Sequence, residues 1–509
     1  MASPYLPSTN TALSRDILLE IVRYYRLEPF DPLAHTKRTQ LRALALVSRQ
    51  LHEIARPEIW RTARTIRHVR RYIELVEDAK INKSLSPWGL NEPLLPETRD
   101  HVLELLSYTR NFAPHQWNSD DFVNSWCFVT MSLDLLHLFP NLELLLLDWA
   151  PFHPHSNDST RKAYIALLAT QTIERVVHYR LRREDRGALI LLHNTLRAQK
   201  APINYVEISN WEELDPGMLP LLLSTSAPVL SFKATRPPSH RTRYRDLFLV
   251  LSGCPTLSTL TIEDAALNDP PNWVFSCSPL HFTKLSSLEI HGKDLQYHKL
   301  FRQLDCPALV SLTLHLKAFE NWRDTFSAMS SFKKLQNVVV TVVEGNRELR
   351  LEDLKLFLEE LSIKRLRILG VASQMTEDDV TELLALASTM KSLIIEGPKS
   401  TPLSLSVIKT ISHQPFSCME EICLPIDFTT AIPLPAAPPA HPRTNVVKRL
   451  LIHSGSILPQ TMRSKIKVAE YIGDLLPSAI IQPLAEESTF GSIVRDVDEL
   501  RSYIGGKAK

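Results

Sequence analysis

Glycine is scarce in this chain, which has only 13 glycines in 509 residues. Apart from the adjacent Gly505 and Gly506, no two glycines lie closer than 14 positions. Phosphate-binding loops and nucleophile elbows need glycines a few residues apart, because only a residue without a Cβ lets the backbone turn so tightly or approach a phosphate. The sequence therefore lacks the common nucleotide-binding and hydrolase motifs. We expect a protein that is not an enzyme and has no catalytic residues.

Cysteines, net charge and long apolar runs are also in short supply. The six cysteines include no Cys-x-x-Cys pair, which favours reduced, buried thiols over a disulfide framework. A net charge of +2 gives no general attraction to nucleic acid or to an anionic membrane. Residues 1–13 have no signal-peptide pattern, and the dense apolar run 144–147 is far too short for a membrane span. These absences predict an intracellular protein, in the cytoplasm and/or the nucleus, without a membrane partner.

Candidate metal and nucleic-acid motifs are incomplete. His153 and His155 have no neighbouring cysteine or acidic cluster that would complete a coordination shell. The run that begins at His52 has Arg56 where a zinc-protease helix needs its second histidine. The arginines of segment 236–245 lack the interleaved aromatic side chains of a nucleic-acid surface, apart from Tyr244. We therefore expect no metal and no cofactor, and the sequence favours a protein partner over nucleic acid.

The chain does contain a repeat, in which an apolar residue is followed by two variable residues, an apolar, a variable and an apolar residue. Helical periodicity fills the segments between copies, for example Leu351 to Leu361 and Thr376 to Ala387, where Thr376 is a candidate N-cap. Each unit is therefore expected to be one strand and one helix. The spacing between copies averages about 28 residues, within the usual period of leucine-rich repeats. Thirteen copies begin at positions 142, 173, 203, 229, 257, 285, 309, 335, 363, 390, 419, 447 and 476.

This pattern resembles the leucine-rich-repeat family from about Leu133 to Gln482. The resemblance implies an α/β solenoid of about 12–13 strand–helix repeats, with the strands on the concave side. The family often places asparagine or cysteine eight residues after the first position, and this chain does not, so its turns must be satisfied in another way. The proline-rich segment 431–443 is expected to be an extended surface loop within one repeat, with a ligand for proline-binding domains as the alternative.

The N-terminal segment carries a different pattern. Residues 13–22 place apolar side chains along one stripe of a helix, with Ser14 as a possible cap. A second helix is expected to run from about Thr39 until Pro57 stops it. The order Leu-Ser-Arg-Asp-Ile-Leu-Leu-Glu-Ile, Leu-Arg-Ala-Leu-Ala-Leu-Val-Ser-Arg and Ala-Arg-Pro-Glu-Ile-Trp-Arg is similar to the F-box.

The F-box resemblance implies a small all-α module that binds a Skp-type adaptor and, through it, a cullin complex. The chain departs from the family pattern at Ser14, where proline is usual, at Leu51, where tryptophan is common, and in the longer linker 26–40. The same apolar residues would serve equally well as the module's own core. The candidate adaptor-binding residues are Leu13, Ile17, Leu18, Ile21, Leu44, Val47, Leu51, Pro57 and Trp60.

The two resemblances together predict the domain order and the function. We expect an F-box-like helical module (1–65), a helical linker or N-terminal cap (66–132), the solenoid (133–490), and a C-terminal capping helix and tail (491–509). They imply a substrate-recognition subunit of a cullin-type ubiquitin ligase, with an unidentified protein target bound by the solenoid. The alternative is a repeat scaffold for protein or nucleic acid without a link to ubiquitin.

The strand template also predicts where a target would bind. Its three apolar positions point into the core, so the positions one, two and four after the first face the concave surface. Several of these positions are basic in the C-terminal repeats and would suit an acidic or phosphorylated segment. Alternatively, these charges pair with Glu420 and Glu421 and only keep the sheet soluble. The candidate substrate-binding residues are Lys364, Arg365, Arg367, Lys391, Lys448 and Arg449.

Overall fold

The structure is a computed structural model, and the chain divides into two compact units, Met1–Val229 and Leu230–Lys509. Each unit is considered by itself. The proline-rich residues 433–443, the pair His153 and His155, and arginine-rich residues 236–243 lie outside the described residues. The structure describes residues 15–26, 33–63, 67–77, 94–113, 120–133, 135, 137–148, 168–181, 186–209, 223, 230–235, 244–265, 279–292, 297–317, 321–344, 348–397, 399–413, 418–432, 447–453, 456–484 and 489–507.

The N-terminal module consists of three helices, α1 (Arg15–Tyr24), α2 (Ala34–Ala45) and α3 (Arg49–Trp60). The prediction of one helix from Thr39 to Pro57 is wrong, because the helix breaks before Ser48. Ser48 has an extended backbone, and its hydroxyl accepts a hydrogen bond from the backbone N–H of Leu51 at 3.2 Å. It therefore caps a new helix. Pro57 lies inside α3 and does not end it.

The rest of the first unit is a parallel sheet with helices between its strands. Thr62 pairs with Asn111, and Asn111 pairs with Leu144. Two short strands therefore precede the strand of the first predicted repeat: one at Thr62, just before segment 66–132, and one at Asn111, inside it. Segment 66–132 was expected to be only helical. The elements are β1 (Thr62–Ala63), α4 (Arg67–Glu77), α5 (Pro96–Ser107), β2 (Asn111–Phe112), α6 (Asp120–Leu133), β3 (Leu144–Asp148), β4 (Arg175–Tyr179), α8 (Arg186–Ala198) and β5 (Tyr205–Ser209).

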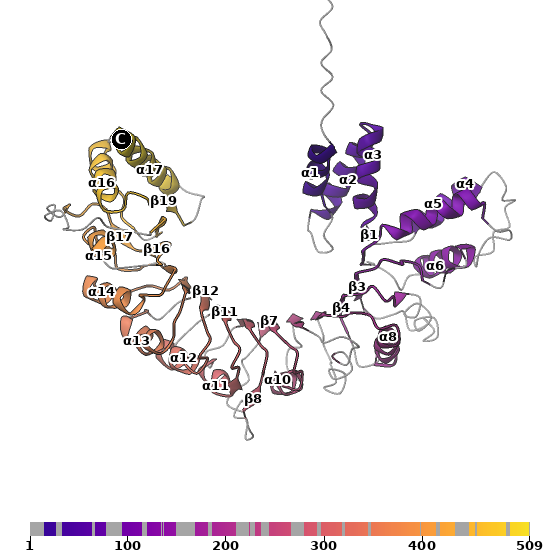
Figure 1. The fold of residues 1–509 in the computed structure, drawn as a ribbon, viewed down its shortest axis with the longest axis horizontal. Coiled ribbons are helices and arrows are strands. Elements are labelled where there is room, and N and C mark those ends of the chain that lie inside the picture. The colour runs from indigo at the N-terminus through magenta and orange to yellow at the C-terminus, as the bar shows by residue number, and fades with distance from the viewer. Residues whose placement is uncertain are drawn as a thin grey trace, which may run out of the picture. The chain divides into compact units, whose positions relative to one another are not determined.

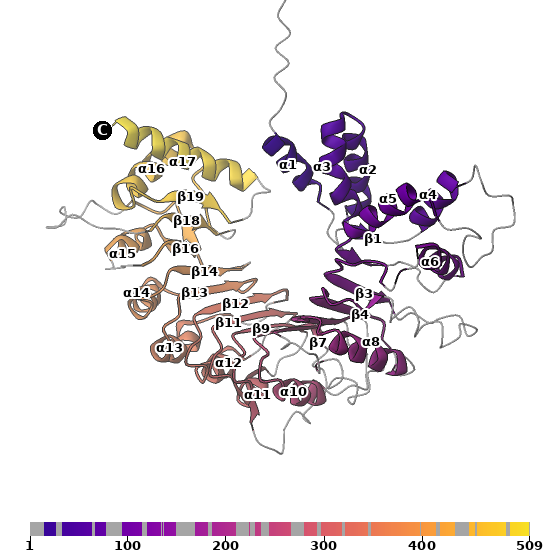
Figure 2. The same cartoon turned by 45° about the vertical axis from the view of Figure 1, so that its right-hand side comes forward.

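The second unit is a longer parallel sheet whose main strands follow the order β6-β7-β9-β11-β12-β13-β14-β16-β18-β19 (Figures 1 and 2). Helices cover one of its faces. The opposite face carries no helix among the described residues, and we call it the helix-free face. The main strands are β6 (Ser231–Thr235), β7 (Thr259–Ala265), β9 (Ser287–Gly292), β11 (Ser311–Leu316), β12 (Asn337–Val342), β13 (Arg365–Leu369), β14 (Ser392–Glu396), β16 (Glu421–Leu424), β18 (Arg449–Ile452) and β19 (Ile480–Pro483).

Helices and short strands connect these main strands. The short strands form two small parallel pairs, β8 with β10 and β15 with β17. The repeat solenoid expected from the sequence is therefore present as strand–helix units on a parallel sheet. The connecting elements are α10 (Tyr244–Ser252), β8 (Leu280–His281), α11 (Tyr297–Phe301), β10 (Leu304–Asp305), α12 (Trp322–Met329), α13 (Leu351–Glu360), α14 (Glu377–Leu386), β15 (Leu403–Ser404), α15 (Val407–His413), β17 (Ile426–Asp427), α16 (Met462–Leu475) and α17 (Thr489–Lys507).

The register of the strands follows the repeat template closely. Corresponding apolar residues lie opposite each other on successive strands, as Leu288, Leu312 and Val338 do. The thirteenth copy is the exception, because Leu450 pairs with Ile481 and not with Ala479. The predicted first residue of that copy, Leu476, is the C-cap of α16. The strand therefore begins two residues later than the pattern predicts.

Aromatic side chains fill the layer between helices and sheet. Trp322 and Phe326 stack in α12 with ring centroids 5.7 Å apart, and Phe357 of α13 lies 5.1 Å from Phe326. All three are buried. Burial of each of these large aromatic side chains contributes about 1.5–3 kcal/mol, so neighbouring repeats stabilise one another.

Thr376 caps α14, as predicted, and forms a reciprocal capping box with Asp379.

Buried polar groups satisfy turns that lack the asparagine ladder. After β14 the backbone N–H of Gly397 donates to Nε2 of His453 at 2.9 Å, and the Ser400 hydroxyl donates to the carbonyl of Gly397 at 3.0 Å. Ser400 also accepts from the backbone N–H of Ser373. His453 is fully buried, and burial lowers its pKa to about 4. A Cβ at position 397 would lie 2.1 Å from the carbonyl oxygen of Val371, so only glycine fits there.

The C-terminal helices α16 and α17 pack against each other, and α17 also packs against β19. Lys465 of α16 forms an ion pair with Asp496 of α17 at 2.6 Å. These helices close the end of the sheet in the second unit. Among the helices that the structure describes, none combines the length and the apolar character that a bilayer crossing requires.

Candidate interaction surfaces

The three helices of the N-terminal module bury a small core of their own. Leu18 and Val22 of α1 meet Leu41 of α2 and Ile54 of α3 in this core. Arg56 attaches the module to the rest of its unit, since its guanidinium contacts the Glu104 carboxylate and donates to the Tyr108 hydroxyl at 3.1 Å. The hydrogen bond from Tyr108 and the one from Arg56 lower the pKa of Glu104.

The predicted adaptor-binding residues separate into three groups in the structure. Leu18 and Leu51 belong to the buried core and offer no surface to a partner, because the three-helix packing uses them internally. Ile17 and Val47 are exposed, at 49% and 71%. Leu13 lies outside the described residues. The partly buried remainder are Ile21, Leu44, Pro57 and Trp60.

Further apolar side chains of the module are exposed where the sequence pattern did not predict it. Leu46, in the turn between α2 and α3, is 86% exposed and lies next to Val47. Tyr24 at the end of α1 and Leu33 before α2 are also exposed. The exposed apolar side chains of the module, which we call its apolar surface, are Ile17, Tyr24, Leu33, Leu46 and Val47.

A pocket of about 440 Å³ opens between α1 and α3. Leu19, Val22 and Ile54 provide its apolar lining, together with Pro57. Its charged lining comes from both helices: Arg15, Arg23, Glu53 and Glu58. The combination of apolar and charged lining suits a protein side chain better than a phosphate group.

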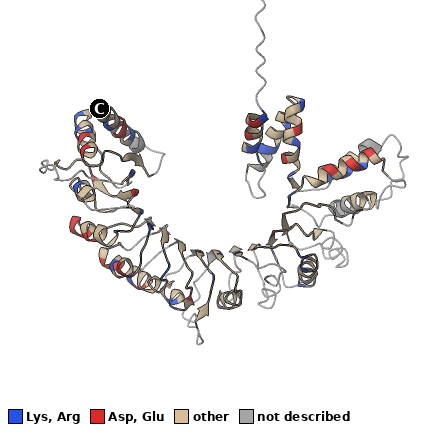
Figure 3. Ribbon diagram, viewed as in Figure 1, with Lys and Arg blue, Asp and Glu red and all other residues tan. Residues whose placement is uncertain are grey.

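The helix-free face of the second unit is lined by side chains that alternate with the buried ones. In β11, Ser311, Thr313 and His315 lie on this face, and the residues between them are buried. Residues at matching positions of neighbouring strands form ladders about 4.8 Å apart. The strands of this unit are mostly without charge, and most charged residues belong to the helices (Figure 3). Several of the charged strand residues are paired with an opposite charge, as Lys233 is with Glu263 and Arg449 with Glu421.

Four exposed basic residues gather on this face at β13 and β14. Arg365 and Arg367 lie on β13, opposite Ser392 and Ile394 of β14. Lys364 and Lys391 precede these two strands, and the backbone N–H of Lys391 donates to the carbonyl of Lys364. Within the part of the chain that the structure describes, none of the four has an ion-pair partner. We call these four the basic cluster.

The other two predicted basic residues do not belong to this cluster, because glutamates neutralise them. Lys448 forms an ion pair with Glu420 at 3.3 Å, and Arg449 forms one with Glu421 at 3.3 Å. Hydrogen bonding by Lys448 lowers the pKa of Glu420. Of the six predicted residues, Lys448 and Arg449 are therefore charge-neutralised at β16 and β18, and the other four form the basic cluster.

An apolar cluster lies beside the basic residues on the same ladder. Ile394, Cys423 and Leu451 follow Arg367 across β14, β16 and β18, and all three are buried. Leu369 and Leu484 pack against them. On the helix-free face, the basic cluster therefore lies between the polar side chains of preceding strands such as β11 and the buried apolar residues of β14, β16 and β18.

No family model matches this chain, and no curated protein is similar to it. Solved structures resemble it only weakly, and one of them illustrates this. That structure, a complex of Rad7 and Elc1 from yeast, matches 76% of this chain and 88% of its own chain with 13% sequence identity and a TM-score of 0.36. We draw no functional conclusion from a likeness of this size.

Three of the described thiols, those of Cys254, Cys306 and Cys423, are not set up as nucleophiles. Burial raises the pKa of Cys306 to about 12, and it also raises the pKa of Cys254 and Cys423. A thiol must ionise to attack a carbonyl or a disulfide, so these groups stay unreactive at neutral pH. The surfaces that remain are the apolar surface of the module and the basic cluster.

Proposed function

We propose that this chain is a non-catalytic substrate-recognition subunit of a cullin-type ubiquitin ligase. The N-terminal module binds a Skp-type adaptor, and the helix-free face of the second unit binds a target protein with an acidic or phosphorylated segment. The observation that carries the proposal is the exposure of Leu46 and Val47 on a module whose core is already complete.

An exposed apolar surface on so small a module favours a partner. Burying a side chain such as Leu46 or Val47 gains about 1.5–3 kcal/mol, part of which offsets the entropy lost on association. Ile17 adds a third apolar contact from α1. The F-box resemblance names the partner class, a helical adaptor, and the pocket beside Pro57 offers it a second point of contact.

The basic cluster supports the second half of the proposal. Arg365 and Arg367 are two residues apart on one strand, so both guanidinium groups project from the helix-free face. Guanidinium groups bind carboxylate and phosphate in a bidentate manner. Neither arginine forms an ion pair among the described residues, but Arg365 interacts electrostatically with Glu420, so an acidic ligand would compete with that carboxylate for Arg365.

Replacing Ile17 and Val47 by Asp tests the adaptor half. Both residues are exposed, so the fold should persist while the affinity for a recombinant Skp-type adaptor falls at least tenfold, because the carboxylates would be desolvated in the interface. The matched control replaces Leu249 and Leu356 by Asp. These residues are similarly exposed but lie on helices of the second unit. Undiminished adaptor binding by the folded Ile17/Val47 variant would refute the proposal.

Replacing Arg365 and Arg367 by Glu tests the target half. Capture of an acidic phosphopeptide by the full chain should weaken at least tenfold, and capture by the unaltered chain should decrease with added salt. The control replaces Arg323 and Lys334 by Glu, which makes the same change in net charge away from the helix-free face. Equal loss in both variants would show a general charge effect. Capture of single-stranded nucleic acid in place of the peptide would favour a scaffold without a link to ubiquitin.

A further inference from the structure

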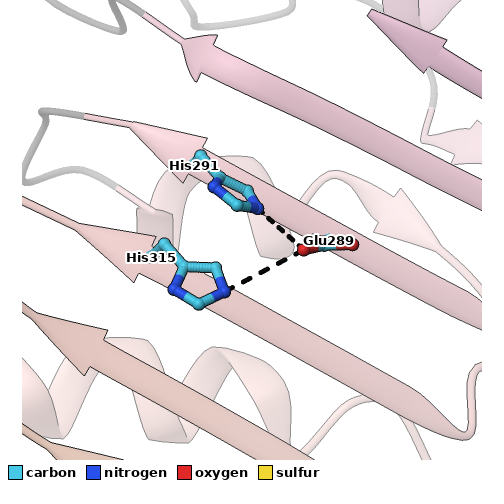
Figure 4. Close-up of side chains that lie close together, drawn as sticks. All are labelled: Glu289, His291 and His315. Atoms are coloured by element: carbon cyan, nitrogen blue, oxygen red, sulfur yellow. Dashed lines mark hydrogen bonds and ion pairs between the residues drawn. The ribbon is translucent and has the colours of Figure 1, made fainter. Parts of the chain in front are cut away.

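Two histidines and a glutamate meet on the helix-free face at β9 and β11 (Figure 4). Glu289 and His291 are two residues apart on β9, so their side chains project from the same face. His315 of β11 lies directly opposite His291 in the parallel register. Nε2 of His291 is 2.7 Å from Oε1 of Glu289, and Nε2 of His315 is 3.9 Å from the same oxygen. The two imidazole rings have centroids 4.2 Å apart.

We propose that Glu289, His291 and His315 form a binding site for a divalent transition-metal ion, with Zn²⁺ as the ion that fits best. Imidazole nitrogen and carboxylate oxygen bind Zn²⁺ at about 2.0–2.2 Å, which places tetrahedral ligand atoms about 3.3 Å apart. The two separations from Oε1 lie on either side of that value. Small side-chain rotations would therefore bring all three ligand atoms to one ion without a change in the backbone.

A neighbouring strand orients the carboxylate. The hydroxyl of Thr261 on β7 donates to Oε2 of Glu289 at 3.4 Å, and this leaves Oε1 toward the two histidines. Outer partners of this kind orient ligands in metal sites and strengthen binding. Burial and the neighbouring His291 lower the pKa of His315.

Three protein ligands leave one tetrahedral position open. All three side chains are partly exposed, so water or a side chain of a bound protein can complete the shell. The site lies on β9 and β11, whereas the basic cluster belongs to β13 and β14. The metal proposal does not depend on the ubiquitin-ligase proposal, and either can fail alone.

Zn²⁺ titration of the full chain without a histidine tag tests the site. We expect one saturable equivalent in the unaltered chain and its loss in His315→Ala. His281→Ala is the matched control, because His281 also pairs with a carboxylate, that of Asp305 at 2.6 Å, but outside this cluster. The control should keep the full equivalent.

A second variant tests the site with a substitution that should leave the fold unchanged. Glu289→Gln keeps the shape of the side chain and removes its charge, so affinity for Zn²⁺ should fall at least tenfold. With Co²⁺ as probe, the unaltered chain should show visible d–d absorption of a tetrahedral site, which both variants lose. Equal Zn²⁺ stoichiometry and affinity in the unaltered chain and either folded variant, or no saturable binding at all, would overturn the proposal.

Discussion

Acidification should destabilise the second unit through His453. This side chain is fully buried, and its Nε2 accepts the hydrogen bond that satisfies Gly397. Burial lowers the folded-state pKa to about 4 from an ordinary value of 6.5, so the unfolded chain binds more protons than the folded chain between these values. Stability is therefore fully present above pH 6.5 and is lost as the pH falls toward 4. Because unfolding is linked to proton binding by His453, the free energy of unfolding should decrease by about 2 kcal/mol between pH 7 and pH 4.5 through this one group.

The variant His453→Gln isolates this effect. Its amide oxygen can still accept a hydrogen bond but does not titrate, whereas every carboxylate titrates in both proteins. The free energy of unfolding, measured with urea at pH 7 and at pH 4.5, should fall by about 2 kcal/mol more in the unaltered chain than in the variant. The packing cost of the substitution is common to both pH values and cancels. An equal fall in both proteins would refute the assignment of His453 as a neutral, buried acceptor.

Three further substitutions, one of them with a matched control, test the capping and the packing. Ser48→Ala removes the N-cap of α3 and should lower the free energy of unfolding of the module by about 1 kcal/mol, measured by chemical denaturation. Gly397→Ala should lower the melting temperature markedly, because its Cβ would clash with a carbonyl, whereas Gly187→Ala, which meets no atom within 4 Å, should be neutral or slightly stabilising. Phe357→Ala should cost about 3–5 kcal/mol in urea denaturation, because it empties a buried ring position between repeats.

The repeat template could be found from the sequence because each copy buries the same three apolar positions. It failed at the thirteenth copy, where Leu476 is buried at the C-terminus of α16 and does not mark the beginning of a strand unit. The two-residue strands at Thr62 and Asn111 are too short to show any periodicity. The break before Ser48 was hidden because Leu46 and Val47 continue an apolar pattern although they are exposed.

The candidate sites were less predictable than the fold. Helical periodicity marks an apolar stripe but does not say what covers it, so buried Leu18 and exposed Ile17 looked alike. No metal was expected, because the motifs sought were local in sequence. The triad becomes visible only when strands are aligned by register, since Glu289 and His291 lie four and six residues after one first position and His315 lies six after the next. The same alignment would have paired Arg449 with Glu421.

The glutamates at β16 limit how much of a ligand the basic cluster can hold. Two strands about 4.8 Å apart span the length of only a few extended residues, so the cluster would contact a short linear motif and not a long acidic tail. Replacing Glu420 and Glu421 by lysine would join the cluster to Lys448 and Arg449 and roughly double that length. Two positions thus set the footprint of the face, and exchange at these positions offers a simple route to a receptor with a longer recognition motif.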